Sequence, residues 1–405
     1  MAHIDRRSRL LTLVLADFAG HDFTFELAKS LRRSGVDVRY QYCRSNQAPR
    51  GRQEAASMGD TRWVQSLSVG RQFSKYHAGR RILDEVKYGW RARSGIGRGD
   101  VVVMANMPVV SGVVIAAWSR VKGARPVLWL QDIQWGLARA SGAAVPVWLG
   151  LRLLEVLLIW LTERTIAISN AFARHAASST RGRRPVVVLE NWATLEAPTT
   201  SPADEQEGAT RSSERPFRFH YSGTLAKKHS SELLLDLARE FERDEQVEVV
   251  VTAAGAGCDD LRAASERDGL NLIVQGLRPA EEVMAALEAA DVLVAVLTDE
   301  AGRYSVPSKV LKYLVAGRPV LFAGPHDNLA AQTITVAEAG LVAAPEAAEV
   351  RAAARKMVAD RAQMAAMGRN GRRWAERHFR TDVVGPRFLE AAGVEPPDST
   401  DRCPL

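Results

Sequence analysis

The residues with the clearest chemical potential lie in segment 305–320, which reads SVPSKVLKYLVAGRPV. Pro307 suits the first turn of a helix, where its missing N–H group costs no hydrogen bond. Free amides and the positive end of the helix dipole attract anions there, and Lys309 adds a full charge. An ordinary helix capped at Gly317 would explain the glycine and the proline but not the lysine, because a cation opposes the dipole. The segment therefore predicts a phosphate-binding helix start.

A second cationic segment, residues 223–229 with the sequence GTLAKKH, follows another predicted strand. A glycine turn that carries two lysines and a histidine suits a diphosphate, because ammonium groups and backbone amides both bind phosphate oxygens. Lys227 is the stronger candidate, whereas Lys228 also fits a solvated cationic loop. His229 fits either a ligand contact or a cap for the helix expected from Ser230.

Polar residues also follow two predicted strands in the first half of the chain. Gly20 and His21 come after the first strand, and Asp132 comes after a later one. Open parallel sheets bind ligands at the carboxyl ends of their strands. At this position His21 either contacts an acceptor or a diphosphate, or is a solvated helix cap. Gly20 either lets a substrate approach the backbone closely or merely permits the turn. Asp132 accepts a proton from a sugar hydroxyl, or caps the next helix.

The elements that must position these residues alternate between strands and helices, which predicts two doubly wound α/β domains. The domains are expected at 1–194 and 217–380, facing across a cleft, and the polar segment 195–216 is the linker. Residues 381–405 contain a helix that crosses back to the first domain, and a tail. The predicted strands are 10–16, 36–42, 101–105, 126–131, 165–169, 186–189, 217–222, 247–253, 271–275, 292–297 and 319–323, and the helices include 22–33 (with Asp22 as its N-cap), 111–121, 361–378 and 383–392.

The composition is that of a globular protein with a basic first quarter. The chain has 405 residues, of which 46% are hydrophobic and 25% charged, and its formal net charge is +7. Residues 1–100 hold nineteen Lys and Arg against ten Asp and Glu. This excess favours an anionic partner such as a nucleotide, a lipid diphosphate or an anionic membrane. Nucleic acid is not expected, because basic and aromatic residues do not interleave.

The cysteines and the apolar segments indicate a cytoplasmic protein. Cys43, Cys258 and Cys403 are odd in number and far apart, which argues for a reducing compartment and against a metal site. The N-terminus shows no signal peptide. Segment 143–161 is interrupted by charges, with Arg152 and Glu155 on one helix face. It fits a core helix or an amphipathic helix at a membrane interface, and the protein then works at the inner face of the membrane.

Three motifs carry a resemblance to a known family. Residues 307–309 (PSK) resemble the Pro-Ser-Lys motif of the retaining GT-B glycosyltransferases of group 1, also called family 4. Residues 220–229 resemble the opening strand and loop of the second domain in the branch that builds colanic acid and O-antigen polysaccharides. Residues 191–192 (NW) resemble the strand end before the interdomain linker. The resemblance implies a GT-B fold and a nucleoside diphosphate sugar as donor.

The resemblance also implies roles for single residues. Lys227 and Lys309 approach the leaving diphosphate from opposite sides, and Asp132 matches an aspartate of the acceptor domain. Tyr304 and Lys312 stand where many members have two glutamates, which removes a ribose contact. Loop 301–305 holds the sugar or its phosphate. The residues expected to bind the donor are Gly223, Thr224, Gly255, Gly257, Arg278, Ser305, Pro307 and Ser308, and those on the acceptor side are Gly20 and His21.

The resulting hypothesis is a transferase that moves a sugar from a nucleoside diphosphate to an acceptor hydroxyl. The resemblance implies that the anomeric configuration is retained and that a donor phosphate oxygen takes the acceptor's proton. No metal and no cofactor is expected. The acceptor is a lipid-linked saccharide or a soluble natural product. Two alternatives stay open: a nucleotide-sugar 2-epimerase with the same architecture, and a non-catalytic binding protein or partner subunit.

Overall fold

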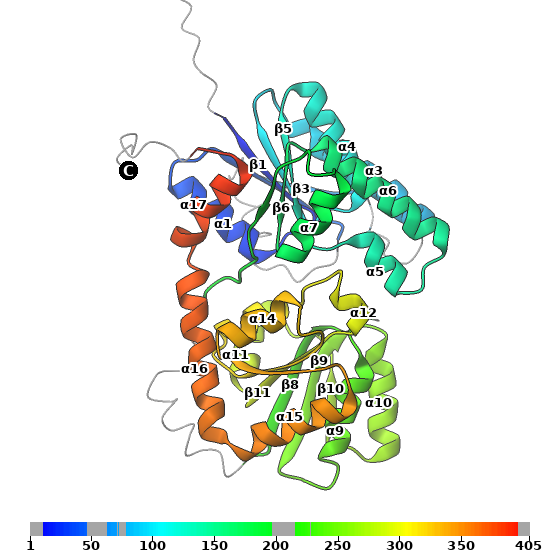
Figure 1. Cartoon of the computed structure of the whole chain (residues 1–405), viewed down its shortest axis with the longest axis vertical. Coiled ribbons are helices and arrows are strands. Elements are labelled where there is room, and N and C mark those ends of the chain that lie inside the picture. Colours follow the sequence, from blue (N-terminus) through cyan, green and yellow to red (C-terminus); the bar gives the residue numbers. More distant parts are fainter. Residues whose placement is uncertain are drawn as a thin grey trace, which may run out of the picture. The chain divides into compact units, whose positions relative to one another are not determined.

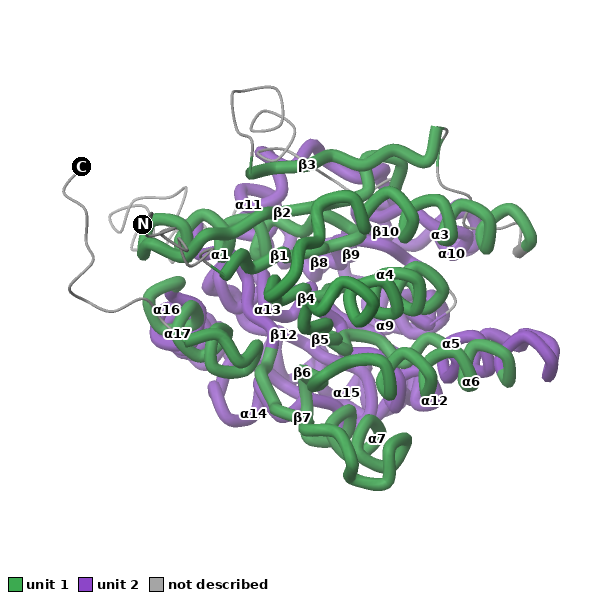
Figure 2. The backbone as a smooth tube through the Cα atoms, turned by 90° about the horizontal axis from the view of Figure 1, so that it is seen from above, with its two compact units in different colours: residues 1–134, 149–190, 381–405 green, residues 135–148, 191–380 purple. Residues whose placement is uncertain are grey.

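The computed structural model describes residues 11–46, 63–70, 72, 78–196, 215–226 and 228–395. The chain divides into two compact units (Figure 2). Unit 1 comprises residues 1–134, 149–190 and 381–405, and unit 2 comprises residues 135–148 and 191–380. Each unit is built around its own sheet.

Unit 1 contains a seven-stranded parallel sheet with the order β3-β2-β1-β4-β5-β6-β7 (Figure 2). Its central strands are buried along their whole length and apolar except for Asp17, as expected for a sheet covered on both faces. The order reverses between β1 and β4, and ligands bind at such switch points in doubly wound sheets. The strands are β1 (Leu13–Asp17), β2 (Val38–Cys43), β3 (Val64–Leu67), β4 (Val101–Ala105), β5 (Arg125–Leu130), β6 (Arg164–Ala167) and β7 (Val186–Val188).

The helices of unit 1 bury one face each against this sheet or against one another. α17 (Thr381–Ala392) lies beside α1 (Asp22–Arg33) in Figure 1, and its Phe388 ring packs 5.2 Å from the ring of Trp129. His21, not Asp22, occupies the N-cap position of α1, so the predicted cap is one residue off. The remaining helices are α3 (Ala78–Ala92), the short 3₁₀ helix η1 (Arg93–Gly95), α4 (Val109–Lys122), α5 (Gln134–Ala140, mostly in unit 2), α6 (Val145–Leu161, shared by both units) and α7 (Asn170–Ser179).

Helix α6 covers most of segment 143–161, whose sequence fits either a core helix or a membrane-interface helix. The predicted polar face with Arg152 and Glu155 is wrong. Glu155 is buried, and its carboxylate lies 2.7 Å from Nε2 of His175 on α7. The carboxylate turns inward because it finds this partner, so the face exposed on α6 is largely apolar.

Unit 2 contains a six-stranded parallel sheet with the order β10-β9-β8-β11-β12-β13. Strand β13, like β3 of unit 1, was not predicted, because its four residues are only partly buried and begin with a glycine. A Cβ atom on that glycine, Gly340, would lie 1.9 Å from the carbonyl oxygen of Val320. The strands are β8 (Phe217–Thr224), β9 (Val247–Ala254), β10 (Leu272–Gln275), β11 (Val292–Val296), β12 (Val320–Ala323) and β13 (Gly340–Ala343).

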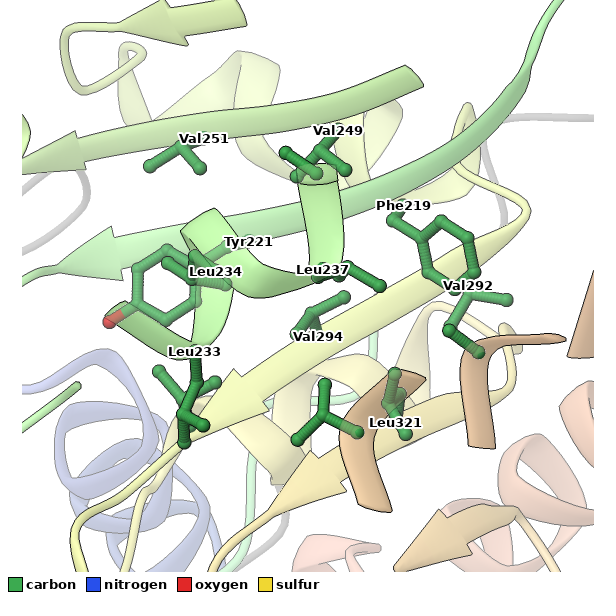
Figure 3. Close-up of a cluster of buried hydrophobic side chains, with 14 of the residues drawn as sticks. Phe219, Tyr221, Leu233, Leu234, Leu237, Val249, Val251, Val292, Val294 and Leu321 are labelled. Carbon is green, nitrogen blue, oxygen red and sulfur yellow. The ribbon is translucent and has the colours of Figure 1, made fainter. Parts of the chain in front are cut away.

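The core of unit 2 lies between the sheet and its helices. Figure 3 shows Leu233, Leu234 and Leu237 of α9 pointing toward side chains of four neighbouring strands. Packing of this kind stabilises the unit through removal of apolar surface from water. The helices are α9 (Ser231–Glu240), α10 (Gly257–Asp268), α11 (Ala280–Glu288), α12 (Asp299–Gly302), α13 (Lys309–Val315), α14 (Leu329–Val336), α15 (Ala347–Ala359) and α16 (Arg361–His378).

No helix in the described part of the chain is long and apolar enough to cross a membrane. Among the same residues, no group of three or more His, Cys, Asp or Glu side chains could hold a metal ion. Cys43 and Cys258 are buried and form no disulfide within the described residues, and Cys403 lies outside those residues.

Candidate functional site

The predicted donor-binding residues of unit 2 gather at one edge of its sheet. Since the strands are parallel, their carboxyl ends share this edge. Gly223 and Thr224 end β8, and the turn with Gly255 follows β9. Arg278 follows β10, and Lys309 begins α13 after β11 and α12. The topology thus brings residues that lie far apart in the sequence to the same side of the unit.

Lys309 is the most unusual of these residues. Its Nζ atom is buried, and no hydrogen-bond acceptor for it lies within the described ranges. The atom sits 3.5 Å from the ring centroid of Tyr221, on the π face. Burial, and then the charge of Lys228, holds the pKa of Lys309 well below its usual range. A buried ammonium without an acceptor is costly, so this side chain is suited to an anionic ligand.

The backbone around Lys309 leaves room beside the amine. Gly223 has φ 123°, which side-chain-bearing residues rarely adopt, and a Cβ atom there would lie 3.6 Å from Cε and Nζ of Lys309. Buried Tyr313 of α13 ties its own helix to β8, because its hydroxyl accepts a hydrogen bond from the amide of Ser222 at 3.0 Å. The exposed Thr224 accepts a hydrogen bond from the Tyr221 hydroxyl through its carbonyl oxygen, at 2.7 Å.

Lys228 belongs to the same cationic cluster. Its Nζ donates a hydrogen bond of 2.8 Å to Oγ of Ser305, which is buried. The side chain of Asn328 donates to the carbonyl oxygens of Ser305 and Gly302, at 2.9 and 2.8 Å, and so fixes the loop that carries Ser305. This contact argues against the solvated loop cation that the sequence left open as an alternative for Lys228. Lys227, the stronger candidate from sequence, lies outside the described residues.

His229 is buried beside both lysines and stays neutral. Burial, followed by the charges of Lys309 and Lys228, lowers the pKa of His229 to about 2. Its Nδ1 atom accepts a hydrogen bond from the amide of Ala226 at 3.2 Å, which closes a turn in the loop. The N-cap of α9 is Ser230, so His229 does not fill the capping role considered from sequence.

Three further predicted donor residues have close neighbours within unit 2. A Cβ atom on Gly255, at φ 141°, would lie 2.2 Å from the carbonyl oxygen of Leu225. One on Gly257 would lie 3.0 Å from Cδ2 of the same leucine. Packing against Leu225 therefore constrains both positions, most strongly Gly255, and a donor contact at either glycine stays a prediction. The guanidinium of Arg278 donates to Gln275 at 3.2 Å and lies 3.6 Å from the carboxylate of Glu282.

The Pro-Ser-Lys segment enters its helix later than predicted. α13 begins at Lys309, two residues after Pro307, and it has seven residues. Ser308 has helical backbone angles but makes no side-chain cap. The carbonyl oxygens of Pro307 and Ser308 accept from the amides three residues ahead, so tight turns replace the expected first turn of α-helix.

The two positions that depart from the family pattern are engaged in contacts of their own. Nζ of Lys312 lies 3.9 Å from the carboxylate of Glu196. The ring of Tyr304 packs 5.5 Å from that of Trp135, and a Cβ atom on Gly136 would lie 2.1 Å from the Tyr304 ring. The aromatic pair thus requires glycine at position 136.

Unit 1 has a separate polar cluster at the switch point of its sheet. Asp17 ends β1 and is fully buried, and it accepts hydrogen bonds from the amide of His21 at 2.7 Å and from Nδ2 of Asn106 at 3.3 Å. Thr24 Oγ1 also donates to this carboxylate. Burial alone would raise the pKa of Asp17, but the charge and hydrogen bonds of His21 and the hydrogen bond of Thr24 outweigh it and lower the pKa.

The predicted acceptor-side residues surround this cluster. Gly20 has φ 71°, and a Cβ atom there would lie 3.3 Å from the Tyr42 side chain, so the turn itself requires glycine. The side chain of His21 is 42% exposed. Half-buried Asp132 follows β5, and α5 begins at Gln134, so residue 133 rather than Asp132 precedes that helix. Asp17 and Asn106 were missed from sequence, although a charged residue at the end of an apolar strand was a usable signal.

Comparison with known proteins relates unit 2 to one enzyme family. Residues 203–374 match the family model described as "Glycosyl transferases group 1". A search of curated protein sequences gave no significant match. The matched residues lie within unit 2, so the match relates this unit to the family.

Solved structures with the same fold cover nearly the whole chain. HepE of Anabaena in complex with UDP-glucose is 16% identical with a TM-score of 0.68, and the match covers 95% of this chain and 99% of that one. Sucrose-phosphate synthase of Thermosynechococcus elongatus is 14% identical with a TM-score of 0.71, covering 94% and 98%. WaaG, described as a glycosyltransferase involved in lipopolysaccharide biosynthesis, is 15% identical with a TM-score of 0.62, covering 95% and 99%. At these identities the likeness shows the fold, which is the GT-B arrangement of two Rossmann-like domains.

Proposed function

We propose that this protein transfers a sugar from a nucleoside diphosphate sugar to an acceptor hydroxyl, and that Lys309 binds the diphosphate of the donor. The observation that carries the proposal is the buried Nζ of Lys309, which has no acceptor among the described residues and lies at the carboxyl edge of the sheet. The match of residues 203–374 to group 1 glycosyltransferases supports the same chemistry. HepE, which shares the fold, was solved with UDP-glucose, so a uridine nucleotide is the first candidate.

The chemistry follows from where charge develops. When the bond between the sugar and the diphosphate breaks, negative charge accumulates on the leaving phosphate. Lys309 and Lys228 are held in place before the reaction, by the Tyr221 ring and by Ser305, and so stabilise this charge without reorganisation. We propose that these cations act without a metal, that Lys227 joins them, and that the anomeric configuration is retained. A donor phosphate oxygen then takes the proton of the acceptor.

The acceptor side is assigned to unit 1. We propose that His21 and Asp132, with Gly20, bind an acceptor of the kind used in polysaccharide pathways, namely a lipid-linked saccharide. The excess of basic residues in the first hundred positions supports work at an anionic membrane surface on the cytoplasmic side.

The membrane surface is expected on α6. Leu149, Leu153 and Leu157 lie four residues apart and are 41%, 65% and 44% exposed, so they form an apolar stripe on unit 1. A helix of this kind lies in the membrane interface with its apolar face buried.

Replacing Leu153 and Leu157 together by glutamate should therefore abolish binding to anionic vesicles, because charge replaces the inserted face. Co-sedimentation with phosphatidylglycerol-containing vesicles at low salt measures the effect. Val336→Glu is the control, since Val336 is 75% exposed but lies on α14 of unit 2. Equal sedimentation of wild type and the double variant would contradict this surface.

A thermal-shift screen tests the donor site. Wild-type protein is heated with UDP, GDP, dTDP and their common sugars. A ligand at about a hundred times its dissociation constant stabilises by about 2.7 kcal/mol, which gives a measurable rise in Tm. The rise in Tm should be largest with the nucleotides of one base, and we expect the uridine nucleotides to give it. No shift with any nucleotide would contradict the proposed function.

Donor binding should also take up a proton. In the free protein the pKa of Lys309 is lowered, whereas a bound diphosphate raises it again. Between these two pKa values the complex holds one more proton than the free protein, so affinity falls as the pH rises through that window. Calorimetric titration of UDP in buffers of different ionisation enthalpy measures the uptake. The uptake should disappear in Lys309→Met, and uptake that persists in this variant would show that another group is responsible.

A further inference from the structure

The polar cluster of unit 1 includes Asn106, whose side chain contacts both Asp17 and His21. Asn106 follows β4 and has φ 48°, a left-handed conformation that asparagine tolerates better than most residues. This backbone carries its carboxamide to Asp17 of the neighbouring strand β1 and to the imidazole of His21. Neither Asp17 nor Asn106 has a role in the chemistry described above.

The orientation of the Asn106 amide follows from its partner. Asp17 is a buried carboxylate that other donors hold in its ionised form, so it only accepts hydrogen bonds. Asn106 must therefore turn its NH₂ group toward Asp17, at 3.3 Å. The same nitrogen lies 3.0 Å from Nδ1 of His21.

This amide decides the tautomer of the histidine. An NH₂ group can only donate, so the Nδ1 atom of neutral His21 must accept through its lone pair. The proton of the neutral ring then sits on Nε2. We infer that Asn106 and Asp17 hold His21 as a hydrogen-bond donor through Nε2–H to an oxygen of a neutral acceptor sugar, and not as the base that activates the acceptor.

The charges around His21 favour a neutral ligand over a phosphate. Asp17 on β1, Asp22 on α1 and Asp132 after β5 raise the pKa of His21 and outweigh burial, which lowers it. When the imidazole of His21 becomes charged, its second proton is on Nδ1, which lies 3.4 Å from Oδ1 of Asp17. Nε2 keeps its proton in this form and can still donate a hydrogen bond. Three carboxylates repel a phosphate, whereas a sugar hydroxyl accepts from Nε2–H at no such cost. His21 would thus be an acceptor-binding residue, with Asn106 and Asp17 as positioning residues.

Nitrogen NMR of the whole protein labelled with ¹⁵N-histidine tests the tautomer. The signals of His21 are assigned by their loss in His21→Gln. Long-range ¹H–¹⁵N spectra above the pKa should show a protonated Nε2 and an unprotonated Nδ1. Asn106→Asp should move the proton to Nδ1, because a carboxylate then accepts where an amide donated, and aspartate also tolerates the backbone. A wild-type ring protonated on Nδ1 would overturn the inference. This result comes from the spectrum of the wild type, so it is obtained even if the variant does not fold.

The ligand class is tested on the same signals. Methyl glucoside, methyl galactoside and methyl mannoside are titrated separately, and pyrophosphate is titrated in parallel. At least one glycoside should shift the Nε2–H signal of His21, and pyrophosphate should not. A shift with pyrophosphate, or no shift with any glycoside, would overturn the assignment to a neutral sugar. The inference about the sugar rests on the proposed function, but donor binding is measured separately by the thermal-shift screen, so the two can fail independently.

Discussion

Replacing Lys309 by alanine is expected to lower turnover of the nucleotide sugar by at least about a hundredfold, as the loss of one preorganised electrostatic stabiliser does. The reason is the position of Nζ, which is buried over the Tyr221 ring, with Lys228 nearby. Alanine removes the charge that faces the leaving diphosphate, and Lys228 can move into its place only by leaving Ser305. Turnover is measured as nucleoside diphosphate released from the sugar nucleotide that the thermal-shift screen identifies.

A matched control separates this effect from a general loss of charge. Lys356 is an exposed lysine on α15 of the same unit, and Lys356→Ala should leave turnover unchanged. Unfolding temperatures of both variants should stay close to that of the wild type, or rise for Lys309→Ala, because that substitution removes a buried charge. If turnover of Lys309→Ala is near the wild-type value, the diphosphate does not bind at this site.

Replacing Gly255 by alanine is expected to destabilise unit 2 by about 3 kcal/mol, which corresponds to a fall in Tm of about 6–12 °C for a unit of this size. The backbone at φ 141° is nearly inaccessible to alanine, and the new Cβ atom would meet the Leu225 carbonyl oxygen at 2.2 Å. Either the turn after β9 or the loop after β8 must move. Because that loop leads to Lys228, donor binding should weaken as well.

Gly276→Ala is the control for this substitution. Gly276 also follows a strand of unit 2, but its Cβ atom would meet nothing within 4 Å and its φ is not in the left-handed range. Its Tm should change by no more than about 2 °C, as for an ordinary surface substitution. If the two variants unfold at the same temperature, packing against Leu225 is not the reason for glycine at position 255.

Most of the fold could be predicted from the sequence, because its central strands are continuous apolar runs. β4 and α16 have the predicted bounds, and α1 differs only in its cap. β3 and β13 could not be predicted, because neither is an apolar run like the equally short edge strands β7 and β10. β3 contains Gln65 and Ser66, and β13 begins with Gly340. Such strands are recognised by pairing, which is a long-range property and leaves little local pattern.

The candidate site was predicted in part. Lys309 and Gly223 could be predicted because a lysine after proline and a glycine after a strand are local signals. Tyr221 and Asn328 could not, because their roles come from contacts that only the fold creates: a ring beneath an amine and two hydrogen bonds to a loop. The same limit applies to Asn106, which follows β4 and contacts His21 after the neighbouring strand β1. The bond from Lys228 to Ser305 could not be predicted either, because the sequence around Lys228 resembles that of any exposed loop.

The central claim is that Lys309 of unit 2 holds the diphosphate of a nucleotide donor. Isothermal titration of UDP into the wild type and into Lys309→Ala, at one pH and salt concentration, tests it most directly. The wild type should bind one UDP, and the variant should bind at least about tenfold more weakly, the loss that removing one charge-assisted contact of about 1.5–3 kcal/mol produces. Equal affinities of the two proteins, or no binding by the wild type, would contradict the claim.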